Sequence, residues 1–559
     1  MAKPSLPVRA ARIYRSLNAI QMIRSIRKIL TKTIALWFAL LIFLISCGDL
    51  PHQPIGTQAT ARIFGEVIAP SVTNTITSLA PTHWETPIIK ILGTPKNTPE
   101  LTKTFLKQRT STPTPLVYYA QSGDTLSVVA SHFNISTTEI TSAQSIPSQG
   151  LIPYNQPLYL PASLAHRIKP DYLLPDSEVV YSISAVDFNI SAYLKKSGGF
   201  LSTYREYLAS TGWTSAADII QRVALENSVN PRLLLALLEY RCHCVSGDIA
   251  PECDKDALLG NGDFRRAGLF RQLSWASSQL ALGYYGWRSG KLAEFSLKDG
   301  SIISPAPNLN AGSVALLVYF AFEKDREKWI EAVNPQSGFI SLYKDMFGDP
   351  WKRAASIEPL LPADLTQTPM QLPFEPGRGW SYTSGPHAAW EENGAQAALD
   401  FAPATYNSGC LPTDAWVTAV ADGLVVRSAF NYVIQDLDDP FDGKSDGLEQ
   451  TGWAVLYMHI AEKGAVQAGT YLKTGDRIGQ PSCEGGRSTG THVHIARKYN
   501  GEWVLADGYL PFNLSGWEAH AGKKPYEGTL TKNGQTLVAH WFGSFETRIA
   551  LPTATPKTP

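Results

Sequence analysis

The chain has 559 residues, which at roughly 100–200 residues per domain suggests about three to five units. Hydrophobic residues make up 44% and charged residues 18%, a globular balance that excludes wholesale disorder and a collagen-like architecture. Lys+Arg and Asp+Glu number 49 each, so the net charge is zero. No overall positive field would draw this protein to nucleic acid, and we expect no nucleic-acid partner.

Residues 1–46 are interpreted as a signal peptide. A basic stretch precedes a short apolar run over 33–46, and this order is typical of a secretory signal that is too short for an ordinary spanning helix. The run ends in Leu-Ile-Ser-Cys47, which resembles the lipobox of bacterial lipoproteins and implies a lipid on Cys47. Met22 is an alternative start, and an uncleaved anchor helix is the alternative interpretation. Either way we expect an extracytoplasmic protein, anchored to the membrane and facing the cell wall.

The cysteines predict disulfides, which persist outside the cytoplasm. Cys410 and Cys483 lie in one predicted domain and are the expected pair. The other three, Cys242, Cys244 and Cys253, leave one unpaired or form a metal cluster with His243.

After a Pro/Thr-rich linker over 47–115, residues 116–163 predict a small module. Val117–Ala120 and Pro157–Leu160 are predicted strands, and Thr125 and Thr138–Ala143 mark two helices. The Gly-Asp-Thr-Leu sequence that begins at Gly123 and the closing Gln-Pro-Leu-Tyr-Leu-Pro resemble the LysM module. The resemblance implies binding of glycans that contain N-acetylglucosamine, such as peptidoglycan. A degenerate module that only packs is the alternative.

Residues 170–357 predict a mostly α-helical domain. Apolar residues recur at helical spacing over Ala216–Ser228, Pro231–Tyr240 and Ala311–Phe322. The order of segments faintly resembles lysozyme-like lytic transglycosylases, which implies Glu239 as a glycan-cleaving acid. Tyr240 departs from the Ser of that family, and a structural carboxylate is the alternative for Glu239.

Residues 366–545 carry the clearest chemistry. His492 and His494 lie two apart in a predicted strand, so their side chains point to the same side. His387, Asp400 and His459 occur upstream in strand-like or Gly/Pro-rich sequence. Nitrogen and oxygen ligands with an open position for water are typical of a catalytic zinc site. The pattern therefore predicts a zinc hydrolase.

These segments resemble the M23 family of zinc metallopeptidases, in particular its beta-lytic and staphylolysin branch. The resemblance implies that His387, Asp400 and His494 bind one Zn²⁺ and that His459 and His492 form a catalytic pair. Most members have His-x-x-x-Asp, where this chain has Gln396, but the branch places its first His well before the Asp. Tyr382 and Tyr457 are further candidates for stabilising the oxyanion.

Two segments of this region carry weaker predictions. Alternating carboxylates over Asp436–Asp446 suggest Ca²⁺, but a solvated acidic loop is the preferred interpretation. Residues 546–559 are predicted to be a disordered tail.

The predicted fold class is multidomain: a small βααβ LysM module, a mostly α-helical middle domain and a mostly antiparallel β M23 peptidase domain. The predicted function is an exported peptidoglycan endopeptidase held on glycan by LysM. The alternatives are a non-enzymatic wall-binding scaffold, or a bifunctional hydrolase that also cleaves glycan with Glu239.

Overall fold

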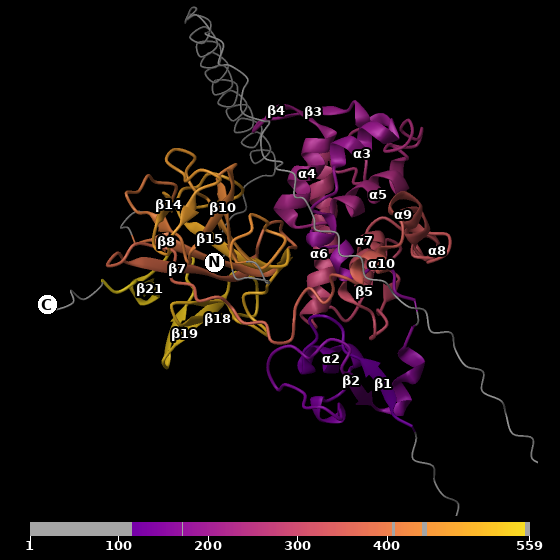
Figure 1. Ribbon diagram of the computed structural model, residues 1–559, viewed down its shortest axis with the longest axis horizontal. Coiled ribbons are helices and arrows are strands. Elements are labelled where there is room, and N and C mark those ends of the chain that lie inside the picture. Colours follow the sequence, from indigo (N-terminus) through magenta and orange to yellow (C-terminus); the bar gives the residue numbers. More distant parts are fainter. Residues whose placement is uncertain (1–113, 170, 405–408, 439–443, 554–559) are drawn as a thin grey trace, which may run out of the picture. The chain divides into compact units, whose positions relative to one another are not determined.

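The computed structural model describes residues 114–169, 171–404, 409–438 and 444–553 (Figure 1). The predicted signal peptide, Cys47 and the linker up to residue 113 lie outside the described residues. Among the helices that are described, none has the length and apolar character needed to cross a membrane.

The first described module is a two-stranded sheet with one helix. Strands β1 (Leu116–Tyr119) and β2 (Pro157–Leu160) pair antiparallel. Helix α2 (Leu126–Phe133) begins at Thr125, whose side chain accepts a hydrogen bond from Val128 N, as the sequence predicts. The second predicted helix is shorter than expected, a 3₁₀ turn over Thr137–Glu139 that is closed by a capping box.

The middle domain is helical, as predicted. Its helices are α3 (Ile190–Ser197), α4 (Ala216–Asn227), α5 (Pro231–Cys242), α6 (Leu269–Arg288), α7 (Ala311–Ala321), α8 (Arg326–Ala332), α9 (Phe339–Phe347) and α10 (Pro350–Ala354). Two small hairpins, β3–β4 (Arg205–Leu208 and Gly212–Ser215) and β5–β6 (Phe295–Ser296 and Ile302–Ile303), complete it. Every residue of α7 is buried, which is typical of a helix at the centre of a domain.

The C-terminal domain is built on a nine-stranded antiparallel sheet with the order β13-β10-β11-β12-β15-β8-β7-β21, and β16 pairs with β15. Its strands are β7 (Trp380–Ala388), β8 (Gln396–Pro403), β10 (Gly423–Ala429), β11 (Tyr432–Asp438), β12 (Trp453–Met458), β13 (Tyr471–Leu472), β15 (Val493–Tyr499), β16 (Glu502–Trp503) and β21 (Arg548–Ile549). A small pair joins β9 (Val417–Thr418) and β14 (Arg477–Gly479). A four-stranded sheet comprises β17 (Asn513–Leu514), β18 (Trp517–Ala521), β19 (Gly528–Lys532) and β20 (Gln535–Val538).

The central strands are buried on both faces. On β15, Ile495 belongs to the core of the sheet domain, whereas its neighbour Ala496 belongs to the core that contains the middle-domain helices. Leu399 and Ala398 of β8 divide in the same way. This alternation follows from the two-residue period of a strand, and it fixes the strands that carry the predicted ligands from both sides.

The prediction of a disordered tail over 546–559 is wrong for the first part of that range. Strand β21 pairs with β7 through Arg548↔Ser381 and Ile549↔Trp380, and Ile549 is buried in the core of the sheet domain. The apolar Ile549 and the free edge of β7 give this short segment a place in the sheet. Residues 554–559 lie outside the described residues.

Arg288, at the end of α6, connects three parts of the described chain. Its guanidinium donates to Glu502 of β16 (Nε–Oε1 2.8 Å) and to Asp176 of the middle domain (Nη2–Oδ2 3.0 Å). It also donates to the carbonyl oxygen of Ser122 in the first module. Nearby, the ring of His132 stacks on Trp287 with centroids 3.6 Å apart.

Candidate metal centre

Three neighbouring strands bring the predicted ligands together. His494 on β15 lies directly opposite Asp400 on β8 in the strand register. His387 lies on β7, where its pairing with β8 is irregular between Ser384 and Ala388. Such irregularities redirect side chains, and here they turn His387 toward the other two. One donor atom from each of the three buried residues lies within 4.8 Å of the others.

Hydrogen bonds fix which nitrogen each histidine presents. His387 Nδ1 donates to Gly385 O (2.8 Å), and His494 Nε2 donates to Ala389 O (3.1 Å). The remaining nitrogens, His387 Nε2 and His494 Nδ1, face each other at 3.0 Å and each lies 3.2 Å from Asp400 Oδ1. Carbonyl partners of this kind orient the histidine ligands of metal ions.

The donor set fits a metal ion. Asp400 Oδ1 is buried and receives no hydrogen bond. A buried carboxylate oxygen without a donor is costly, and two imidazole lone pairs converge on the same point. A cation would satisfy all three donors at once, and two nitrogens with one carboxylate oxygen match the ligand preference of zinc.

The histidines of the site favour the ionised form of the Asp400 carboxylate, which is the form that binds a metal ion. Burial opposes ionisation of Asp400, but His387, His492 and His494 hold its pKa well below the usual range. Burial also lowers the pKa of His494. For His387 burial acts in the same direction, but the carboxylate of Asp400 outweighs it and raises the pKa. Asp400 therefore stays ionised at neutral pH.

His459 and His492 lie beside this set and outside it. His459 directly follows β12 in a left-handed conformation (φ 63°), and its Nδ1 donates to Glu484 O at 2.9 Å. His492 Nδ1 donates to Gly490 O at 2.7 Å, and its Nε2 lies 3.8 Å from Asp400 Oδ1. The two rings are 4.4 Å apart. Burial lowers the pKa of His459 to about 3, so this imidazole is neutral at neutral pH.

The Cys410–Cys483 disulfide is present, as expected. Next to it, Thr491 bonds to both neighbours of Cys410: its backbone N–H donates to Gly409 O (3.1 Å) and its hydroxyl accepts from Leu411 N (3.0 Å). These contacts hold the segment that leads directly into His492. Elsewhere Cys242 and Cys253 are bonded to each other, and Cys244 is a buried free thiol.

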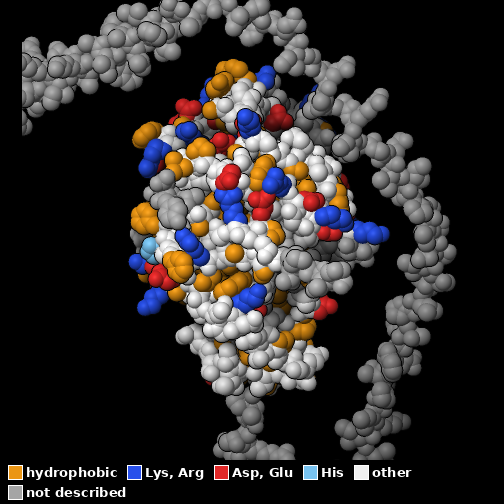
Figure 2. Space-filling model, turned by 90° about the vertical axis from the view of Figure 1, so that its left-hand side faces the viewer, with side chains coloured by type: hydrophobic (Ala, Val, Ile, Leu, Met, Phe, Trp, Pro, Cys, Tyr) orange, Lys and Arg blue, Asp and Glu red, His pale blue; other side chains and the backbone are white. Residues whose placement is uncertain are grey.

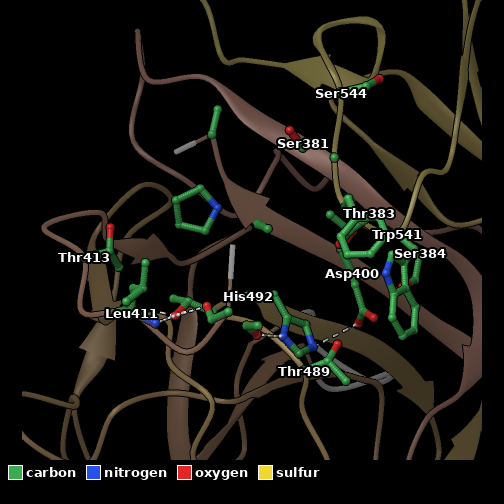
Figure 3. Close-up of a pocket in the computed structure, with 18 of the residues that line it drawn as sticks. Ser381, Thr383, Ser384, Asp400, Leu411, Thr413, Thr489, His492, Trp541 and Ser544 are labelled. Atoms are coloured by element: carbon green, nitrogen blue, oxygen red, sulfur yellow. Dashed lines mark hydrogen bonds and ion pairs between the residues drawn. The ribbon is translucent and has the colours of Figure 1, made fainter. Parts of the chain in front are cut away.

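A cleft of about 510 Å³ opens beside Asp400 and His492 (Figure 3). Its lining includes Ser381, Thr383 and Ser384 from β7, and also Trp541 and its neighbours in the chain. Of the three candidate ligands, Asp400 lines this cleft, so the cleft borders the candidate metal site.

Glu239 has a different environment. Its carboxylate accepts hydrogen bonds from Val245 N (2.8 Å), Ser246 N (3.1 Å) and the Ser246 hydroxyl, and it lies 3.0 Å from His243 Nδ1. Both oxygens therefore organise the loop after α5. These contacts support the structural alternative, and the glycan-cleaving role of Glu239 stays a prediction.

The two candidate oxyanion donors, Tyr457 and Tyr382, and the acidic segment Asp436–Asp446 have different surroundings. The Tyr457 hydroxyl accepts from Val420 N and donates to Gln435 Oε1, so it is used within the core. Tyr382 is buried against Phe401. The solvated-loop interpretation of Asp436–Asp446 is wrong for its first residue, because Asp436 is buried in strand β11 and accepts a hydrogen bond from Gly447 N. Residues 439–443 lie outside the described residues, so the calcium alternative stays a prediction.

One residue of the site was not predicted. The ring of Tyr526 stacks on His387, with centroids 4.5 Å apart. Tyr526 lies in the turn between β18 and β19, far from any ligand in sequence, and no local pattern signals it.

Comparison with known proteins gives matches in several parts of the chain. The model of the LysM domain matches residues 118–161, and that of the LasA N-terminal domain matches residues 172–362. Protease LasA of Pseudomonas aeruginosa is 26% identical over 369 residues, covering 62% of this chain and 79% of the relative. Beta-lytic metalloendopeptidase of Lysobacter enzymogenes is 28% identical over 181 residues, covering 30% of this chain and 90% of the relative.

Among solved structures, the M23 metalloprotease pseudoalterin is 23% identical, with a TM-score of 0.25, and covers 32% of this chain and 96% of that chain. The LysM match and the LasA and beta-lytic relatives show that the chain is a metallopeptidase that carries a LysM domain, and the constellation on β7, β8 and β15 is compatible with this class.

Proposed function

We propose that this chain is a peptidoglycan endopeptidase that hydrolyses wall peptide stems or cross-bridges with one zinc ion held by His387, Asp400 and His494. The observation that carries the proposal is the buried Asp400 oxygen without a donor, which faces two imidazole lone pairs. When bound there, zinc would lower the pKa of a water ligand and polarise the scissile carbonyl.

His459 and His492 are the proposed proton-transfer and oxyanion pair. In each imidazole Nδ1–H donates a hydrogen bond to a backbone carbonyl, so Nε2 remains available for the reaction. An imidazole with an unprotonated Nε2 can take up the proton of the attacking water, and a protonated imidazole can stabilise the developing oxyanion; the pair is proposed to share these two roles. The proximity of His492 to Asp400 places the pair at the edge of the proposed metal site.

The LysM domain is the proposed wall anchor. LysM binding to N-acetylglucosamine-containing glycan would keep the peptidase near its substrate by raising the effective concentration. A lipid on Cys47 would add a membrane tether on the outer side of the cytoplasmic membrane.

The test is the chemistry of the products. Purified peptidoglycan is digested with the full-length protein loaded with zinc, and the fragments are analysed by mass spectrometry. We expect new amino termini and unchanged muramic-acid ends. His387→Ala is the inactive control, and Glu239→Gln should leave the products unchanged. Altered glycan ends that disappear with Glu239→Gln would support the bifunctional alternative instead.

A further inference from the structure

The segment His540–Arg548, here called the aromatic loop, exposes three large rings. Trp541 is 66% exposed, Phe542 73% and Phe545 80%. Figure 2 views the molecule from the side on which Figure 1 draws β21, and hydrophobic side chains reach the surface there in several groups. Clustered exposed apolar surface marks binding sites more often than chance placement does.

The aromatic loop is anchored on the strand that carries His387. His540 N donates to Tyr382 O (3.2 Å), and Gly543 N donates to His540 O (2.7 Å), which closes a turn. A Cβ at Gly543 (φ 65°) would lie 2.9 Å from Ser381 Oγ, so the turn lies directly on β7. The loop is therefore ordered before any ligand binds, which lowers the entropy cost of binding.

The aromatic loop and the catalytic residues share one cleft. Trp541, Phe542 and Phe545 line the cleft that also includes Asp400 and His492. Figure 3 shows Trp541 next to Ser384 and Asp400. Leu411 and Pro412, which directly follow the disulfide-bonded Cys410, add further apolar lining. A volume of about 510 Å³ is in the range of small-ligand sites.

The cleft lining carries few formal charges. Of the described residues that line it, Asp400 and Arg548 are those with a formal charge. Arg548 lies over the ring of Phe545, with its guanidinium carbon 5.3 Å from the centroid, and its side chain is exposed. None of the ion pairs among the described residues includes Arg548. An exposed guanidinium that is held by an aromatic ring is suited to bind a carboxylate.

We propose that the aromatic loop is the substrate-binding wall of the peptidase, and that it selects acidic peptides. Trp541 and Phe542 contact the peptide beside the scissile bond, and Arg548 pairs with a substrate carboxylate displaced from that bond. This inference rests on the proposed function for the reaction, but its binding part is tested without hydrolysis.

The kinetic test uses cross-linked muropeptides as substrate and the full-length protein. We expect the double variant Trp541→Ala/Phe542→Ala to raise KM at least tenfold, with kcat within about threefold and zinc content unchanged. The matched control is Trp213→Ala, which removes an equally exposed ring (65%) from the β3–β4 hairpin of the middle domain. Trp541→Phe should restore most of the loss if ring surface is what matters.

The carboxylate test compares native muropeptides with the same muropeptides after amidation of their carboxyl groups. Amidation should raise KM for the wild-type protein, and Arg548→Ala should abolish the difference between the two substrates. Arg548→Lys should keep part of it, because it retains the charge and loses the fork geometry.

A binding measurement separates failure of this inference from failure of the proposed function. The same muropeptides are titrated into the His459→Ala variant, with and without Trp541→Ala/Phe542→Ala, at equilibrium. A tenfold lower affinity of the variant without the two rings supports the aromatic loop as the substrate-binding surface, even if the wild-type protein releases no new amino termini. Equal affinity with and without the rings, or an amidation effect that persists in Arg548→Ala, would overturn the inference.

Discussion

Replacing Arg288 by Met is expected to destabilise the protein by about 3–5 kcal/mol, the usual loss when one partner of a buried ion cluster is removed. The side chains of Arg288, Asp176 and Glu502 are 5%, 2% and 1% exposed. Met fills much of the same volume but leaves both carboxylates buried without their cation. The Ser122 carbonyl also loses its donor, so the contact between the LysM domain and α6 should weaken.

The loss should depend on pH in a defined direction. Burial raises the pKa of Glu502 above its ordinary value of 4.5, although Arg288 acts to lower it. Without Arg288 the pKa rises further, so the folded variant binds a proton more readily than the unfolded chain does. Acidification from neutrality toward the ordinary carboxyl pKa therefore favours the folded variant, and the loss should shrink over that range.

The assay is denaturant unfolding of the full-length protein at several pH values, combined with hydrogen exchange of peptides that contain Ser122 or Glu502. Arg288→Met should speed exchange in both peptides. Adding Glu502→Gln should recover part of the stability, because the uncompensated charge is gone. The control is Arg265→Met, which breaks an exposed pair with Asp263 and should leave the midpoint unchanged. A loss below about 1 kcal/mol at neutral pH, or no recovery with Glu502→Gln, would refute the reasoning.

Three further predictions concern the metal site. His387→Ala and His494→Ala should each lower zinc content below the expected one ion per chain, measured by elemental analysis; unchanged content in both would contradict the ligand assignment. His459→Ala and His492→Ala should keep the metal but lose about 10²–10⁴-fold in kcat, and near-normal turnover in either would remove its proposed role. Cys410→Ser/Cys483→Ser opens a bond with a sequence separation of 73, and it should cost on the order of 4 kcal/mol and speed exchange around His492; an unchanged unfolding midpoint would argue against this support.

One part of the candidate site could be predicted from the sequence because strand geometry is local. The two-residue period places His492 and His494 on one side of a strand, and this holds whatever the rest of the chain does. The assignment of His387, Asp400 and His494 as ligands came from the family resemblance. The register irregularity of β7 around His387 cannot be derived from the sequence. Tyr526 could not be found at all, since its contact with His387 depends on the packing of β18 and β19 against β7.

Three helices of the middle domain, α4, α5 and α7, were predicted from local patterns, as the strands were. Ser215 caps α4, and Pro231 opens α5 after the Asn230 cap, so both boundaries are written in neighbouring residues. Strand β21, at the end of the aromatic loop, could not be predicted from its own residues. A two-residue strand has too few positions to show alternation, and Gly543, Ser544 and the Pro-rich end resemble a free tail.

Arg288 shows why interdomain chemistry is hidden from sequence. In the sequence Gly-Trp-Arg-Ser-Gly, Arg288 has the position of a cation at the C-terminal end of a helix. The helix dipole alone would account for a positive charge there. Besides Tyr284 in its own helix, its partners are Ser122, Asp176 and Glu502. These three come from three domains, and none of them is near Arg288 in the chain. The same arrangement bears on function: Glu502 lies on β16, which pairs with the strand that carries His494. The LysM domain, the helices and the sheet that carries the proposed ligands therefore all contact Arg288. We expect a change in the packing of the LysM domain against α6 to reach the strand that carries His494 through this one side chain.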